Sequence, residues 1–482
     1  MFCKDCDKFY NVVSIFPNTE PSIKGIDCLE QDAYVMMNTT TLVLTTTKTD
    51  YISSSEKASI TASVTGGNGG YKYKIGSSEY QASNVFTDLI EGSYTITAKD
   101  RNNNTISTVV KISKKPVFVA KLVVLHGVTK TFTTTDTFSS YSWSVVGGTI
   151  VSGGNSQTVT ILFPTIGNAT VTVNTINSNG ATGTASYNIE VTDKILVSTK
   201  TVLQGPSVYN LITGTFLMKD TLRVKGHIPY KQPYGTTPYN NSFYVNVKNT
   251  GDETINSNVL GITGYASNLI DPISDNPKNV VDWVYLQLRT KNPGVEVYPV
   301  YSTRSALILR DGSIVDVDGV SPVKFKVDAL STNDLLNKFY LVVKHRNHLG
   351  AMTKFPIGFN ENATGYYLSD EFDFTSKDSV FWNNNTGNTP VVTIQQFNAL
   401  WAGDSNGDGQ IKSTGSSNDL AALQLKVGVS TPNNIIKGYY REDVNMDGLV
   451  TYAASLNSED KILIQTISPN NQTIIEKIPP SS

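Results

Sequence analysis

Residues 57–75 read KASITASVTGGNGGYKYKI: two runs in which every second residue is apolar, separated by a glycine-rich turn. Similar runs follow at 84–89 (NVFTDL), 91–100 (EGSYTITAKD) and 105–113 (TISTVVKIS). Alternation with a period of two places apolar side chains on one face of a β-strand, and Gly/Asn turns between such runs are typical of antiparallel neighbours. The pattern predicts that residues 51–114 fold as a β-sandwich of about six strands. A strand follows the glycines where a phosphate-binding loop would have a helix, so the glycines are expected to form turns.

The same kind of pattern continues through two further segments. In residues 115–194, a run around Trp143 (YSWSVV) leads into a Gly-Gly turn and several alternating strands. The alternation points Trp143 inward, where it is expected to fill the space between two sheets. Residues 195–395 are the largest segment, with predicted strands at DWVYLQLRT, SALILRDGSIVDVDG and FYLVVKHRNHL. Both segments are therefore predicted to be β-sandwiches as well.

A different pattern occurs twice near the C-terminus: Asp-x-Asn-x-Asp-Gly at residues 404–409, and again 39 positions later at residues 443–448. Alternate oxygen-bearing side chains on a tight loop converge on one point, and the glycine permits the sharp turn that a hard cation requires. Each copy leads into an apolar run with helical spacing. Two such copies indicate a calcium-binding module. Its first ligands are predicted to be Asp404, Asn406, Asp408, Asp443, Asn445 and Asp447.

The remaining ligands depart from the usual twelve-residue calcium loop. Position 7 supplies a backbone carbonyl, here from Gln410 and Leu449. Position 12 should be acidic, but neither copy has an acidic residue there. The next carboxylates, Asp419 and Asp460, stand just before the helical runs, so we expect lengthened loops that these two residues close around Ca²⁺. The alternative is a pair of Asx-turns that bind no metal.

Several stretches resemble known families. The loop pair, over about residues 400–467, resembles the dockerin-type calcium repeat in a lengthened form seen at the ends of surface proteins of gliding and gut bacteria. The string VTGGNGGYKYKIGSSEYQASNVFTDLIEGSYTITAKD resembles the SprB-type repeat of bacterial adhesins, and residues 141–191 resemble a PKD-type domain. The strand order in residues 195–395 resembles a large β-sandwich that precedes dockerin-like tails in the same bacteria. These resemblances imply non-catalytic, immunoglobulin-like modules.

The predicted fold class is therefore mainly β: tandem immunoglobulin-like β-sandwich domains with a small α-helical, dockerin-like calcium-binding domain at the C-terminus. The predicted domains are an N-terminal attachment segment (1–50), a SprB-like β-sandwich (51–114), a PKD-like β-sandwich (115–194), a large β-sandwich (195–395), and a calcium-binding domain with a C-terminal tail (396–482).

Charge and composition argue against several functional classes. The chain has 39 Lys and Arg against 41 Asp and Glu, a net charge of −2, which disfavours a nucleic-acid-binding surface. No stretch approaches the roughly 18 apolar residues that a membrane-spanning helix needs, and no secretory signal is recognised. The sequence has no G-x-S-x-G motif, which would mark a nucleophile elbow. It also offers no two carboxylates that can be assigned as the facing pair of a glycosidase. The protein is therefore expected not to be an enzyme, not to bind nucleic acid and not to insert into a membrane.

One histidine pair was a candidate metal site on spacing alone. His345-x-x-His348 lies on a strand-like run, where residues i and i+3 point to opposite faces, so we expect a poor chelate. A zincin helix would need H-E-x-x-H, and the Glu is missing.

The N-terminal residues 1–50 contain all three cysteines of the chain, Cys3, Cys6 and Cys28. These could form part of a zinc site completed by another chain, whereas the alternative is a set of reduced thiols, which agrees with assembly in the cytosol. Apolar islands in this segment suggest that it orders against a partner; a ragged tail is the alternative.

These features lead to one functional hypothesis and two alternatives. Modules of an exported adhesin without a recognised export signal fit a protein that is assembled inside a cell and later exposed outside it. The leading hypothesis is a homo-oligomeric phage virion component, either a head fibre, a capsid decoration protein or a tail appendage. Residues 1–50 would dock it to a virion protein, and its exposed face would contact a host surface glycan or protein. The alternatives are a secreted, extracellular cell-surface adhesin, and an accessory protein of a glycan-degrading complex with the dockerin-like pair as its plug.

Overall fold

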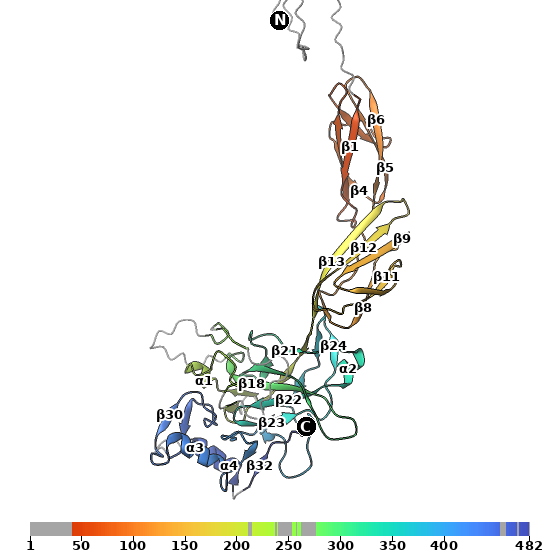
Figure 1. Ribbon diagram of the computed structural model, residues 1–482. Helices are drawn as coiled ribbons and strands as arrows, with labels where there is room; N and C mark the ends of the chain where they lie inside the picture. Colours follow the sequence, from red (N-terminus) through yellow and green to blue (C-terminus); the bar gives the residue numbers. More distant parts are fainter. Residues whose placement is uncertain are drawn as a thin grey trace, which may run out of the picture. The chain divides into compact units, whose positions relative to one another are not determined.

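The computed structural model describes residues 41–210, 215–236, 239, 253–256, 258–261, 276–453, 459–469 and 472–481 (Figure 1). Within these residues the fold is mainly β, with multiple sheets and a few short helices, which confirms the predicted fold class at this level. The chain divides into two compact units. The described part of the first unit comprises residues 41–49, 58–89 and 93–110, and the second contains the rest.

The first unit is built from two three-stranded sheets with the orders β1-β2-β4 and β3-β5-β6. Burial alternates along β2, so that Ile60 and Ala62 are fully covered between more exposed neighbours. The glycines between β2 and β3 include Gly67 at φ +61°, a left-handed conformation that glycine adopts without a steric penalty. The strands predicted from the alternation, β2 to β6, are confirmed, whereas β1 lies in residues assigned to the attachment segment and instead pairs with β2 along its whole length. Their bounds are β1 (Val43–Lys48), β2 (Ala58–Thr65), β3 (Lys72–Ile75), β4 (Val85–Leu89), β5 (Gly92–Lys99) and β6 (Thr105–Ile112).

The second unit begins with a pair of sheets ordered β10-β11-β8 and β7-β13-β12-β9. Trp143 on β9 is 5% exposed, its ring lies 5.0 Å from that of Phe118, and its Nε1 donates a hydrogen bond to Ser156 O at 2.9 Å. The inward position predicted for Trp143 is therefore confirmed. The strands are β7 (Val123–Leu125), β8 (Thr129–Thr133), β9 (Ser140–Val146), β10 (Thr149–Ser152), β11 (Thr158–Leu162), β12 (Gly167–Ile176) and β13 (Thr182–Thr192).

Two further sheets of the second unit share the largest hydrophobic core, and we call them the large sandwich. Their orders are β21-β14-β25-β24 and β23-β22-β18-β19-β20-β15-β26. The strands are β14 (Lys194–Val197), β15 (Thr199–Lys200), β18 (Val280–Arg289), β19 (Val300–Leu309), β20 (Ser313–Val315), β21 (Val323–Lys326), β22 (Tyr340–His345), β23 (His348–Met352), β24 (Phe359–Glu361), β25 (Tyr367–Ser369) and β26 (Phe372–Asp373). Beside them lie the hairpins β16 (Ser207–Asn210) with β17 (Thr215–Met218) and β27 (Val392–Ile394) with β28 (Phe397–Ala399), and the helices α1 (Thr221–Val224) and α2 (Thr332–Asn337).

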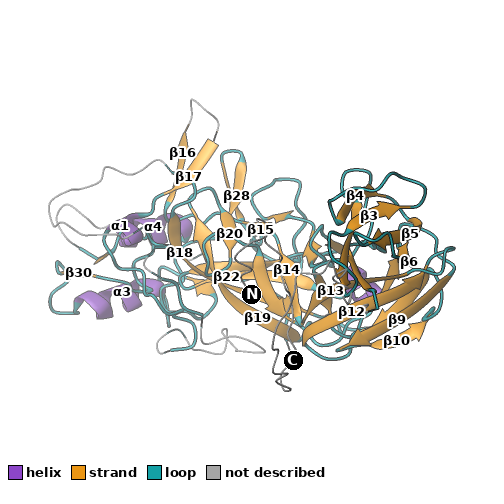
Figure 2. Ribbon diagram, turned by 90° about the horizontal axis from the view of Figure 1, so that it is seen from above, coloured by secondary structure: helices purple, strands orange, loops and turns teal. Residues whose placement is uncertain are grey.

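The C-terminal part of the second unit carries two nine-residue helices, α3 (Asp419–Val427) and α4 (Glu459–Ile467), which contact each other (Figure 2). Leu423 and Val427 of α3 and Ile464 of α4 are buried in one small core. Asn418 caps α3, because its side chain accepts the Ala421 N–H at 2.9 Å. Two short ladders complete this part: β29 (Gln410–Ile411) with β32 (Ile474–Ile475), and β30 (Ile435–Lys437) with β31 (Leu449–Thr451).

Candidate metal centre

The first Asp-x-Asn-x-Asp-Gly segment forms a tight turn around Asp404. Asp404 Oδ1 accepts the N–H groups of Gly407 (2.7 Å) and Asp408 (3.0 Å), and its Oδ2 accepts the N–H of Gly409 (3.1 Å). Asn406 Oδ1 also accepts the Asp408 N–H at 2.9 Å. The segment thus wraps its backbone around its own first carboxylate.

The second segment repeats this turn. Asp443 Oδ1 accepts the Asp447 N–H at 3.0 Å, and its Oδ2 accepts the Gly448 N–H at 2.8 Å. Asn445 Oδ1 accepts the same Asp447 N–H at 3.1 Å. The two segments, 39 residues apart, therefore have equivalent internal contacts at equivalent positions.

Each segment is closed by a carboxylate in the first turn of the following helix. Asp419, the first residue of α3, accepts the N–H groups of Ser405 and Lys412, both at 2.8 Å. Asp460, in the first turn of α4, accepts those of Val444 and Thr451, both at 2.9 Å. These donors occupy positions 2 and 9 of each loop, although Asp460 lies two positions further along its loop than Asp419. We call residues 404–409 with Asp419 the first loop, and residues 443–448 with Asp460 the second loop.

The structure thus places the ten predicted ligand residues in two sets of five. Gln410 and Leu449 begin β29 and β31, and their N–H groups donate to Asp408 Oδ1 (2.9 Å) and Asp447 Oδ1 (2.8 Å). Asp419 and Asp460, which spacing alone nominated, contact the same loops as the earlier residues.

The four carboxylates at the loop ends are buried, none being more than 7% exposed. Burial raises the pKa of Asp404 to about 8, and repulsion from Asp419 adds to this shift. Burial also raises the pKa of Asp419 and of Asp460 to about 7. It raises the pKa of Asp443 well above the usual value, although Arg346 opposes the shift. Since burying an ionised carboxylate without a counter-charge is costly, each loop favours a nearby cation at neutral pH.

The donor chemistry of both loops fits calcium, because carboxylate, amide and main-chain oxygens are the ligands that this ion prefers. In the described part of the chain, however, no three His, Cys, Asp or Glu side chains converge on a common metal position. The carboxylates instead accept loop N–H groups. An ionised carboxylate has about four lone-pair sites, so these contacts leave further acceptor capacity on each Asp.

The prediction that His345 and His348 point to opposite faces of one strand was wrong. β22 ends at His345 and β23 begins at His348, so the two residues face each other across a two-residue turn, with their Nδ1 atoms 3.0 Å apart. His345 Nε2 lies 3.1 Å from Asp282 Oδ2, and His348 Nε2 accepts the Gly205 N–H at 3.1 Å. All four ring nitrogens therefore have partners within the protein. The turn dipeptide Arg346-Asn347 is not one of the usual two-residue hairpin signals, so the pattern of the run did not mark this turn.

Arg346, in that turn, was not nominated from the sequence. Its side chain is fully buried, its Nε donates to Asp282 Oδ2 at 2.9 Å, and its Nη1 donates to Tyr440 O. Burial works against ionisation of Asp282, yet Arg346 and His345 hold the pKa of Asp282 below its usual value. The guanidinium also lies 4.4 Å from the centre of the Tyr439 ring. A buried charged cluster therefore joins the large sandwich to the segment that enters the second loop.

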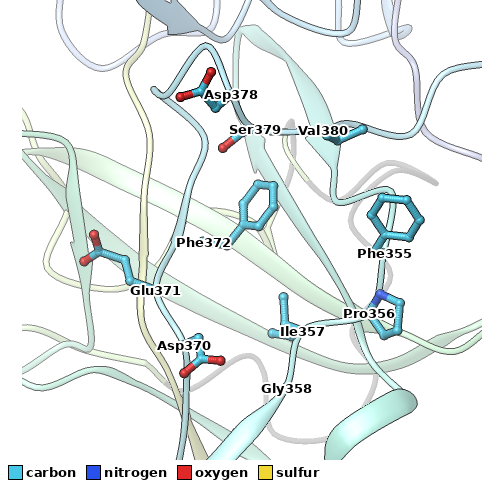
Figure 3. Close-up of a pocket in the computed structure, with 10 residues that line it drawn as sticks. All are labelled: Phe355, Pro356, Ile357, Gly358, Asp370, Glu371, Phe372, Asp378, Ser379 and Val380. Carbon is cyan, nitrogen blue, oxygen red and sulfur yellow. The ribbon is translucent and has the colours of Figure 1, made fainter.

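A surface hollow of about 400 Å³ lies on the large sandwich beside β26 (Figure 3). Phe372 lies within it, and Phe355, 63% exposed, stands at its side. Its charged lining residues, Asp370, Glu371 and Asp378, form no ion pair with another described residue. An aromatic floor with unpaired carboxylates suits a cationic group better than an anionic one.

Some predictions fall on residues that the structure does not describe. Cys3, Cys6 and Cys28 and the first 40 residues of the predicted attachment segment lie outside the described residues. No helix among the described residues is long and apolar enough to span a membrane.

No protein-family model and no curated protein matches the chain. Solved structures that match include a C-terminal 282-residue fragment of intimin bound to the intimin-binding domain of its translocated receptor, at 13% identity over 42% of this chain and 84% of that chain, with a TM-score of 0.22. The fibronectin(III)-like modules of Clostridium thermocellum CbhA match at 17% identity over 30% and 94%, with a TM-score of 0.17. SGBP-B of a Bacteroides ovatus mixed-linkage glucan utilization locus matches at 12% identity over 67% and 65%, with a TM-score of 0.14. Similarity this low carries no argument about function, and the mainly β fold rests on the strands themselves.

Proposed function

We propose that this chain is a non-enzymatic adhesion or display protein whose dockerin-like C-terminal loops bind two calcium ions. The observation that carries the proposal is the equivalent closure of both loops by buried aspartates, Asp404 with Asp419 and Asp443 with Asp460. A structural role as Asx-turns alone would explain the first carboxylate of each loop. It would not explain a second buried carboxylate brought to the same turn from the start of a helix.

Calcium would supply what these residues lack, which is positive charge beside the buried carboxylates of each loop. Each loop offers three Asp, one Asn and one main-chain carbonyl, an oxygen-only ligand set. Because the ion binds the folded loop and not the unfolded chain, its binding free energy adds to the stability of the fold.

Calorimetric titration of the full chain with Ca²⁺ tests this part of the proposal. We expect about two ions per chain for the wild type and about one for Asp404→Ala or Asp443→Ala, since each substitution removes the first ligand of one loop. Glu79→Ala, which removes an exposed carboxylate in the first unit, outside both loops, is the matched control and should bind as the wild type does. Absence of calcium uptake by the wild-type chain would contradict the proposal.

The finer proposal concerns where the protein works. We propose that it is a virion component of a phage, a head fibre, capsid decoration protein or tail appendage, attached through residues 1–50 and homo-oligomeric. A secreted cell-surface adhesin is the alternative setting, and calcium at extracellular levels would fill weak loops in either one.

Mass spectrometry of purified particles distinguishes these settings. The virion proposal expects the chain to co-purify with particles, and deletion of residues 1–40, which keeps β1 in place, to abolish its incorporation. If the chain never co-purifies with particles, or if the truncated chain is incorporated normally, the virion assignment or the docking role respectively is wrong.

A further inference from the structure

Between the ligands the two loops differ at the second position, Ser405 against Val444, and at the fourth, and the fourth position differs in a way that no ligand pattern explains. At the fourth position the first loop has Gly407, at φ +73°, and the second has Met446, at φ +60°. The left-handed conformation costs a residue with a Cβ roughly 1–2 kcal/mol, and glycine avoids this cost. A methionine there requires a compensating contact.

The compensating contact is the core of the large sandwich. The Met446 side chain is 1% exposed and belongs to the same hydrophobic cluster as Val284 and Leu286 of β18. The remaining apolar core of the C-terminal part, around α3 and α4, is a separate cluster. The second loop therefore inserts a side chain into a core that is not its own.

Main-chain atoms of the second loop also lie against the sandwich. Asn347, in the β22–β23 turn, donates from Nδ2 to Asp443 O at 2.6 Å. A Cβ at Gly205 would lie 2.1 Å from Val444 O, so the backbones approach each other as closely as glycine permits. These contacts involve the ligand Asp443 itself and its immediate neighbour.

The first loop is connected to the same sandwich through the C-terminal strand. Gly409 O accepts the Glu476 N–H at 2.9 Å. The Glu476 carboxylate in turn pairs with the buried Lys344 of β22 at 2.9 Å, and accepts the Gly350 N–H of β23 at 2.8 Å. Both loops thus reach the β22–β23 hairpin: the second through Asn347, and the first through Glu476 and through Gly403, directly before Asp404, whose N–H donates to Asn347 O at 3.0 Å.

We propose that the partner of the calcium loops is the large sandwich of the same chain, so that the loops act as an internal, calcium-dependent clasp. This inference rests on the proposed calcium binding. Ion binding at the second loop fixes the turn that holds Met446 in its left-handed conformation, and insertion of Met446 into the sandwich stabilises the same turn. Because such coupling is reciprocal, calcium stabilises the sandwich contact, and the contact raises calcium affinity by the same factor.

Hydrogen exchange of the full-length wild-type chain, with calcium and with chelator, tests the clasp without any substitution. We expect the amides of the β22–β23 hairpin, residues 340–352, to exchange about ten-fold more slowly with calcium than without it. Strands β2 and β5 of the first unit serve as the internal reference and should exchange equally in both conditions.

A substitution that leaves every ligand in place tests the reciprocal effect. Met446→Gly gives the second loop the residue that the first loop already has at this position, so the turn remains accessible. We expect about ten-fold weaker calcium binding at one of the two sites. Gly358→Ala is the control in the same sandwich, because a Cβ there has no neighbour closer than Asp370 Oδ2 at 4.0 Å.

The outcomes separate the two proposals. Suppose that the wild-type chain takes up calcium, but its hairpin exchanges equally with calcium and with chelator, and Met446→Gly binds calcium as tightly as the wild type. The clasp is then wrong, and calcium binding stands. If the wild type takes up no calcium, both are wrong. Slower exchange with calcium together with weakened binding in Met446→Gly supports the clasp.

Discussion

The two calcium-type loops share their ligand pattern and differ in what surrounds them. Both wrap their backbone around a first aspartate and are closed by an aspartate at a helix start. Yet the first has glycine at its fourth position, whereas the second has Met446 buried in the large sandwich. The comparison teaches that the ligand motif determines the turn, and that the residues between the ligands determine how far the turn enters a neighbouring hydrophobic core.

The largest effect should come from a substitution that pushes the second loop away from the sandwich. Gly205→Ala places a Cβ 2.1 Å from Val444 O, so a backbone must move, and such overpacking typically costs about 1–3 kcal/mol. Chemical denaturation of the full chain in calcium measures this loss. Gly358→Ala, the control with open space, should change stability by well under 1 kcal/mol. If Gly205→Ala and Gly358→Ala lowered the free energy of unfolding by the same amount, the close contact between Gly205 and Val444 would not distinguish the second loop from the first.

A smaller, pH-dependent effect should involve both loops in chelator. The folded pKa values of about 8 for Asp404 and about 7 for Asp419 and Asp460 exceed the usual 3.8. The folded state therefore holds protons that the unfolded chain releases, so these groups favour folding most below about pH 4 and progressively less as the pH rises through 7–8. We expect the melting temperature in chelator to be about 5 °C lower at pH 8 than at pH 5.

Calcium should weaken or reverse this pH trend, because the ion binds only deprotonated carboxylates. Thermal melts at pH 5 and pH 8, each with calcium and with chelator, provide the measurement. A melting temperature in chelator that rises between pH 5 and pH 8 would show that the buried aspartates do not govern the trend.

The smallest effect should be confined to the first loop. Asn418→Ala removes the side chain that accepts the Ala421 N–H and caps α3, which costs about 1 kcal/mol. Because α3 carries Asp419, calcium affinity at one site should fall slightly, whereas the hydrogen exchange of the β22–β23 hairpin should stay close to that of the wild type. A loss of protection in that hairpin as large as the one of about ten-fold expected when calcium is removed from the wild type would mean that the two loops are equally attached.

The parts that could be predicted from the sequence are those in which neighbouring residues determine the outcome. Alternation in residues 57–65 gave β2 and its buried face, and the inward direction of Trp143 followed from the same rule. Spacing also nominated Asp419 and Asp460, because a helix start fixes where a carboxylate can return to a preceding loop.

The parts that could not be predicted depend on partners far away in the chain. β18 is buried at all ten positions, including Asp282 and Arg289, so alternation does not identify its two faces. Asp282 is satisfied by His345 and Arg346, more than sixty residues later, and by Tyr439, 157 residues later. The importance of Met446 likewise depends on a core formed by distant strands. No local pattern contains these pairings.

The last described residues have a consequence for handling the protein. Pro479 O accepts a hydrogen bond from the buried Arg289 Nη1 at 2.8 Å, and Pro480 O accepts the Tyr298 N–H at 2.9 Å. Pro479 O and the Glu476 carboxylate thus serve two cationic side chains, Arg289 and Lys344, that are enclosed by protein. Proteolytic trimming of only the final seven residues, 476–482, would therefore leave cations inside the molecule without these acceptors. A chain shortened in this way should be far less soluble than the number of residues removed would suggest.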